Sequence, residues 1–255
     1  MSYNVICLPG GVAPAAQRYG PLKAVVDGRA ELHLKDHELY RGETPPADYS
    51  VEMELDSIDR FADSLGLDRF HLVGYSGGGF VSLAYAGTRP KRLLSLAIFE
   101  PARVPGKPTI EEKAAIDSLG AQLAGLEGGA FMAAFVSAQL KPGVQAPPPP
   151  ARPAPGMEKR PPGIAAMMRA FTVYPFDRDL LRACEFPVYL AYGDLTSDFE
   201  AVQAAVLARL FADIRIQRFA GVHHFVSPQD IYTAAHAQAL EDLWARGSAA
   251  EFALQ

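Results

Sequence analysis

The chain has 255 residues, of which 49% are hydrophobic and 21% are charged, and its formal net charge is −5. This length and composition fit one globular α/β domain and exclude a disordered or fibrous chain. The sequence has no long run of Lys or Arg, which excludes the basic surface that nucleic-acid binding requires.

The first predicted strand, Val5 to Leu8, is a short apolar run that ends in the glycine-rich loop Pro9-Gly10-Gly11. This run is too short for a signal peptide, and no other segment approaches the roughly 20 apolar residues of a membrane span. We therefore expect a cytoplasmic protein with no membrane partner. A weakly alternating strand, Glu31 to Lys35, and a helix that begins after Ser50 and stops near Gly66 follow.

Two buried strands with a helix between them come next. Phe70 to Tyr75 predicts a strand, the turn Ser76 to Gly79 leads into a helix, and that helix ends near Arg89-Pro90. Leu93 to Phe99 is almost continuously apolar, which is typical of a parallel strand that is buried on both faces.

The pattern changes between residues 101 and 186. Helical stretches are predicted at Glu111 to Leu126, Ala130 to Leu140 and Ile164 to Phe171, around the proline-rich segment Gln145 to Pro162. Pro147 to Pro150 cannot join a helix or a sheet interior, so we expect extended polyproline there. We interpret residues 101–186 as an insertion that forms a helical cap.

The α/β alternation then resumes with a strand at Pro187 to Tyr192, a helix at Phe199 to Phe211, a strand at Ile214 to Phe219 and a last helix from Gln229 to Arg246. Alternating strands and helices predict a mostly parallel sheet flanked by helices. We assign residues 1–100 and 187–255 to this core.

The segment Gly74-Tyr75-Ser76-Gly77-Gly78 matches G-x-S-x-G between a predicted strand and a predicted helix. Such a turn pushes its serine into a strained, exposed position, so Ser76 is the candidate nucleophile. Together with Leu72-Val73, the segment resembles the nucleophile region of α/β-hydrolases, and the order of elements is similar over essentially the whole chain outside the insertion. The resemblance implies the α/β-hydrolase fold, with this chain starting at the third strand of the usual family sheet.

The segment Gly221-Val222-His223-His224-Phe225 follows the last predicted strand, and it resembles the family's G-x-x-H segment. The resemblance makes His224 the general base, and the ordinary histidine pKa near 6.5 suits a residue that accepts and returns a proton. His223 is the alternative. His33-Leu34-Lys35-Asp36-His37 lacks further ligands at metal-binding spacing, so we predict no metal and read His37 as a surface or packing residue.

A carboxylate should orient the histidine. The commonest family pattern places it three residues after a strand-ending glycine, but counting from Gly193 leads to Thr196, which cannot serve. Glu100 directly follows the buried run Leu93 to Phe99, some hydrolases resemble this arrangement, and an ionisable residue there needs a partner. We favour Glu100 over Asp198 and Asp194, for which loop and helix-cap roles are the alternative.

The loop Leu8-Pro9-Gly10-Gly11-Val12 resembles the family's oxyanion loop, with Pro9 in place of the usual histidine. Only backbone donors are needed, so we expect the oxyanion hole at the N–H groups of Gly11 and Gly77, with Val12 as a further candidate. The insertion also carries apolar side chains that suit a cap over the site: Phe131, Met132, Phe135, Met167, Met168 and Phe171.

These features predict a serine hydrolase that cleaves a small apolar carboxylic ester, or a related acyl compound, through an acyl-enzyme. No cofactor is expected. Two other readings stay open on the same fold: a cofactor-free lyase or oxygenase, and a non-catalytic ligand sensor. Whether the protein forms a homodimer is also open.

Overall fold

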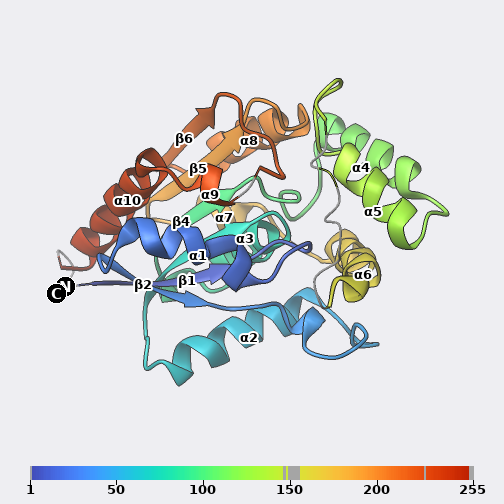
Figure 1. Cartoon of the computed structure of the whole chain (residues 1–255). Coiled ribbons are helices and arrows are strands. Elements are labelled where there is room, and N and C mark those ends of the chain that lie inside the picture. The colour runs from blue at the N-terminus through green and yellow to red at the C-terminus, as the bar shows by residue number, and fades with distance from the viewer. Residues whose placement is uncertain (1, 146–147, 149–155, 227, 253–255) are drawn as a thin grey trace.

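The core of the molecule is one parallel sheet (Figure 1). The computed structural model describes residues 2–145, 148, 156–226 and 228–252. Within these residues the sheet has six strands in the order β2-β1-β3-β4-β5-β6, and every neighbouring pair is parallel. The strands are β1 (Tyr3–Leu8), β2 (Ala30–Leu34), β3 (Phe70–Tyr75), β4 (Leu93–Phe99), β5 (Val188–Gly193) and β6 (Ile214–Phe219). The predicted parallel sheet flanked by helices is confirmed.

Helices cover both faces of the sheet (Figure 1). One apolar cluster joins one face to α2, α3, α7 and α8, and a second joins the opposite face to α1, α9 and α10. No helix in the described part of the chain is long and apolar enough to cross a membrane. The helices of the two faces are α1 (Ala15–Val26), α2 (Val51–Ser64), α3 (Gly77–Thr88), α7 (Asp179–Arg182), α8 (Phe199–Leu210), α9 (Pro228–Ile231) and α10 (Ala234–Phe252).

Three further helices follow β4 in the sequence and lie together at one end of the sheet (Figure 1). They are α4 (Ile110–Leu123), α5 (Gly128–Ser137) and α6 (Arg160–Val173). Leu123, Phe131 and Ile164, one from each helix, form the centre of a separate apolar cluster. These helices therefore pack on one another as well as on the sheet.

The strand order explains where a site can form. The chain runs from β1 outward to β2 and then returns to β3 on the other side of β1. In sheets of this type the loops after the two central strands diverge, and ligands bind in the crevice at the carboxyl ends. The loop after β1 and the turn after β3, which holds Ser76, flank this crevice.

Parts of the helix prediction were wrong, and the short helix α7 was not predicted. Helix α1, which the sequence analysis did not identify, contains Gly20 and Pro21, and both residues weaken a helical pattern. The single last helix that we expected is two helices, because the helical conformation is interrupted between Ile231 and Ala234. The N–H of Ala237 donates to Thr233 O at 3.1 Å, so Thr233 begins a new helix.

The end of the predicted proline-rich segment Gln145 to Pro162 is helical. Pro161 and Pro162 lie in the first turn of α6, where a missing N–H removes no helical hydrogen bond. The extended polyproline predicted at Pro147 to Pro150 falls mostly outside the described residues.

Candidate active site

Ser76 lies on the sharp turn between β3 and α3. Its backbone φ is +53°, a left-handed conformation that costs a non-glycine residue about 1–3 kcal/mol. The turn is held by backbone bonds: Ser76 N–H donates to Phe99 O at 3.0 Å, and Gly78 N–H donates to Pro9 O at 3.0 Å. A Cβ at Gly78 would lie 2.4 Å from Pro9 O, so only glycine fits this position.

Three side chains from distant parts of the sequence meet at the carboxyl edge of the sheet. His224 Nε2 lies 3.1 Å from Ser76 Oγ, and His224 Nδ1 lies 2.9 Å from Glu100 Oε2. All three residues are buried. A histidine between a hydroxyl and a carboxylate can take the hydroxyl proton while the carboxylate stabilises the imidazolium.

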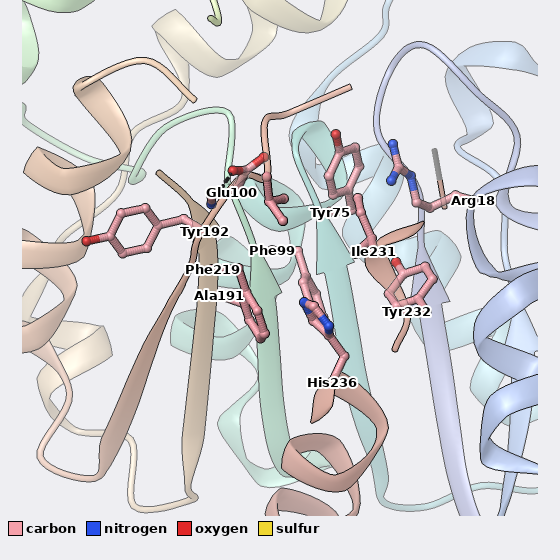
Figure 2. A pocket seen from close by; sticks show the side chains of 12 residues that line it. Arg18, Tyr75, Phe99, Glu100, Ala191, Tyr192, Phe219, Ile231, Tyr232 and His236 are labelled. Atoms are coloured by element: carbon pink, nitrogen blue, oxygen red, sulfur yellow. Dashed lines mark hydrogen bonds between the residues drawn. The ribbon is translucent and has the colours of Figure 1, made fainter. Parts of the chain in front are cut away.

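Glu100 is held by donors from the end of the neighbouring strand β5 and from the segment after it. Its Oε1 accepts a hydrogen bond from Gly193 N–H at 2.8 Å, which Figure 2 shows as a dashed line, and another from the Thr196 hydroxyl. Burial alone would raise the pKa of Glu100, but the contact with His224 and these hydrogen bonds outweigh burial and lower it. The carboxylate is therefore ionised at neutral pH.

The alternative acids lie elsewhere. The side chain of Asp198 is 84% exposed and pairs with Lys141 at 3.3 Å, and Asp198 occupies the N-cap position of α8 without a side-chain capping hydrogen bond. Asp194 Oδ1 accepts a hydrogen bond from Gly221 N–H at 2.8 Å, which is a loop contact. Neither carboxylate is in contact with His224 among the described residues.

The two adjacent histidines have different contacts. His223 Nδ1 accepts a hydrogen bond from Phe225 N–H at 3.1 Å, and burial lowers the pKa of His223. His224 is the residue that the fold brings to Ser76 and Glu100. The imidazole of His223 therefore serves the loop around the site and not the serine.

The two glycines predicted to form the oxyanion hole are neighbours. A Cβ built on Gly77 would lie 3.7 Å from Gly11 N, and both glycines line the same cavity as Ser76. Tyr40 donates its hydroxyl hydrogen to Gly11 O at 2.7 Å, which fixes the peptide after Gly11. Val12, the further candidate donor, packs against the α4–α6 cluster.

His37 supports this loop, a role that its place in the sequence did not predict. Its Nε2–H donates to Pro9 O at 2.8 Å, and its Nδ1 lies 3.5 Å from Glu54 Oε2. The Glu54 carboxylate also accepts hydrogen bonds from the N–H groups of Glu38 at 3.1 Å and Leu39 at 3.2 Å. His37 is thus a buried link between α2 and the loop after β1. Its only sequence signal was a histidine next to a predicted strand.

Tyr75 supports His224 from the other side. Its hydroxyl donates to His224 O, and the two rings stack with their centroids 4.9 Å apart. The Arg18 guanidinium lies over the Tyr75 ring, 3.7 Å from its centroid. Arg18, Tyr75, Glu100 and Tyr232 are among the residues that line a small cavity of about 20 Å³, and Figure 2 shows their side chains. That volume suits one water-sized group and not a substrate.

A larger cavity of about 270 Å³ lies over Ser76. Gly11, Ser76 and Gly77 line it together with side chains from α4, α5, α6 and the start of α8. Four of the apolar residues predicted for a cap line this cavity: Phe135, Met167, Met168 and Phe171. Phe131 and Met132 belong to the apolar cluster between α4, α5 and α6.

Comparison with known proteins agrees with this fold. The sequence model of the alpha/beta hydrolase fold family matches residues 22–144. The chain is 31% identical over 101 residues to a Caulobacter segnis protein named as a carbamate hydrolase, with 37% of each chain covered. It is 40% identical over 77 residues to a monoacylglycerol lipase of Xenopus laevis, with 28% of this chain and 23% of the relative covered.

A solved structure of a thermophilic esterase from Thermogutta terrifontis has a TM-score of 0.74 at 17% identity, with 97% of this chain and 91% of that chain covered. The fold class is therefore a parallel α/β sheet with a nucleophile-type turn after a central strand. The chain therefore has the α/β-hydrolase fold. The matches to the two curated relatives span well under two thirds of their own lengths.

Proposed function

We propose that the protein is a serine hydrolase that cleaves a small carboxylic ester or a related acyl compound. Ser76 is the nucleophile, His224 the general base and Glu100 the acid that orients His224. The N–H groups of Gly11 and Gly77 bind the oxyanion. The observation that carries this proposal is the contact series from Ser76 Oγ to His224 and on to Glu100, at 3.1 and 2.9 Å, beside the 270 Å³ cavity.

The reaction has two halves. Ser76 Oγ attacks the carbonyl carbon while its proton passes to His224 Nε2, and the oxyanion forms beside the two glycine amides. The bond to the leaving alkoxide then breaks, and Nε2–H protonates that alkoxide. Water attacks the acyl-enzyme by the same route, with His224 taking the water proton and returning it to Ser76 Oγ, and the acid is released.

Residues 101–186 act as a cap in this proposal, and residues 1–100 and 187–255 form the catalytic core. The support is that α4, α5 and α6 supply much of the cavity wall. An apolar wall over the serine favours an acyl group with an aliphatic chain or a ring. The relatives named as carbamate hydrolase, monoacylglycerol lipase and esterase also favour hydrolysis at a carbonyl carbon.

Turnover of p-nitrophenyl esters of increasing acyl length tests the proposal, with the Ser76→Ala and His224→Ala variants measured beside the parent protein. We expect turnover by the parent and a loss of about 10³-fold or more in kcat for each variant. The chain-length optimum then measures the size of the cavity.

Two other functions would give different results. A cofactor-free lyase or oxygenase would show no burst of p-nitrophenol, because its serine forms no acyl intermediate. A ligand sensor would bind a small molecule with the same affinity after Ser76→Ala and would turn over no ester. The hydrolase proposal fails if the parent protein gives either pattern.

A further inference from the structure

Arg103 lies on the wall of the catalytic cavity, and no part of the proposed mechanism uses it. The N–H of Ala102 donates to Ser76 O at 2.8 Å, so Arg103 directly follows a residue that is bonded to the nucleophile's backbone. It is half-buried, in contrast to an ordinary surface arginine. A cation therefore lines the same, mostly apolar cavity as Ser76.

The Arg103 guanidinium has no partner within the described residues. No hydrogen bond or ion pair joins it to another described side chain, and its Nε is buried without an acceptor. Burial lowers the pKa of Arg103, and the neighbouring charges on it are Glu112 and Arg178. A half-buried guanidinium without an acceptor is costly, so the position favours a bound anion.

The carboxylate of Glu112, whose charge acts on Arg103, is already paired with Arg178. Glu112 is 1% exposed at its side chain and accepts hydrogen bonds from Arg178 Nη1 and Nη2, both at 2.8 Å. It also accepts a hydrogen bond from Thr109 N–H at 2.7 Å. Arg178 thus neutralises the charge of Glu112, and Glu112 does not neutralise the charge of Arg103.

A second acidic residue lines the cavity but does not balance Arg103. Burial and the negative charge of Glu100 raise the pKa of Glu200 well above its usual range. Glu200 Oε1 accepts a hydrogen bond from Gln203 Nε2 at 3.0 Å, and the raised pKa favours the uncharged form of Glu200. Arg103 is therefore the cationic side chain of the cavity lining, and burial disfavours the charged form of Glu200, its acidic residue.

We propose that Arg103 selects the substrate: the acyl part of the ester carries a carboxylate, separated from the reacting carbonyl by an apolar chain. This inference rests on the proposed function. Arg103 binds the carboxylate through paired N–H donors, and Met167, Met168 and Phe171 contact the chain between the two polar ends. The carboxylate belongs to the acyl part because that part stays on Ser76 in the cavity while the alcohol leaves.

Binding to the Ser76→Ala protein tests this inference without any turnover. The probes are the monomethyl esters of succinate, glutarate and adipate, compared by calorimetry with methyl butanoate, methyl pentanoate and methyl hexanoate. We expect at least one charged ester to bind about tenfold or more tighter than its neutral partner. Adding Arg103→Gln should remove this preference, and Arg103→Lys should keep part of it. Arg215→Gln, on the exposed edge strand β6, is the matched control and should keep all of it.

Each other result overturns the inference: equal binding of charged and neutral esters, a preference that survives Arg103→Gln, or no binding of any ester at millimolar concentration. If Arg103→Gln does not fold, Arg103→Lys is the deciding variant. A preference for the charged ester that is partly kept supports the inference, and a preference that is unchanged overturns it. The parent protein separates the two proposals. Hydrolysis without a preference for the charged ester removes only the role of Arg103, whereas Arg103-dependent binding without any hydrolysis removes only the proposed reaction.

Discussion

The hydroxyl of Thr196 donates a hydrogen bond to Oε1 of Glu100. Thr196 lies three residues after Gly193, the end of β5, where the commonest family pattern carries the acid. Glu100 instead follows the neighbouring strand β4, with a backbone φ of +44°. The carboxylate thus follows β4, and Thr196, at the usual position after β5, supports it.

The first prediction concerns the choice of acid. Glu100→Gln should lower kcat by about 10³- to 10⁴-fold, because a neutral amide does not stabilise the imidazolium of His224. Asp198→Asn should change kcat by less than about twofold, since Asp198 is 84% exposed and pairs only with Lys141 among the described residues. Steady-state kinetics on an activated ester compares the two variants. Equal effects, or a larger effect of Asp198→Asn, would contradict the assignment.

The second prediction concerns Tyr75 as a positioning residue. Tyr75→Phe removes the hydroxyl that holds the His224 carbonyl and keeps the ring that stacks on the imidazole. We expect kcat to fall about tenfold with little change in KM, because the base moves relative to Ser76 while the cavity stays the same. Tyr189→Phe, which loses a hydroxyl bonded to Gln217, is the control. A change confined to KM would argue against this role.

The third prediction concerns the oxyanion loop. His37→Leu removes the donor to Pro9 O and should lower kcat about 10- to 100-fold, because the Gly11 amide is no longer held in place. His37→Gln keeps an N–H donor and should recover part of this loss. His33→Leu, from a half-buried histidine that contacts Asn4 at 3.1 Å, should leave kcat unchanged. If His37→Leu and His37→Gln lose activity equally, the hydrogen bond is not the cause.

Parts of this arrangement were readable from the sequence and parts were not. β3 and β4 have the predicted bounds, because strands buried on both faces are continuous apolar runs. Glu100 was predicted as the acid because it directly follows such an apolar run, where an ionisable side chain needs a partner. His37 and Glu54 gave no such signal, since their contact joins a loop to a helix and exists only in the folded chain. The break before α10 was missed because no glycine or proline marks it.

The fourth prediction concerns stability and pH. Burial would raise the pKa of Glu54, but His37 and the Glu38 N–H lower it below the usual value of 4.5. The ionised Glu54 therefore stabilises the fold above pH 4.5, and this contribution is lost as the pH falls through the lower, folded-state pKa. Glu54→Gln should lower the free energy of unfolding at pH 7 by about 1–3 kcal/mol.

Urea unfolding at several pH values measures this difference. The gap between the parent and Glu54→Gln should narrow as the pH falls below 4.5. Glu52→Gln, an exposed change two residues earlier in α2, should leave stability unchanged at every pH. A gap that stays constant with pH would show that the charge of Glu54 contributes nothing.

The most direct measurement of the central claim is the mass of the protein quenched in acid during turnover of p-nitrophenyl acetate. An acetyl group should appear on the peptide that holds Ser76, in step with a burst of p-nitrophenol, and should be absent from Ser76→Ala. Full turnover with no acylated peptide, or acetylation that persists after Ser76→Ala, would contradict a mechanism in which Ser76 is the nucleophile.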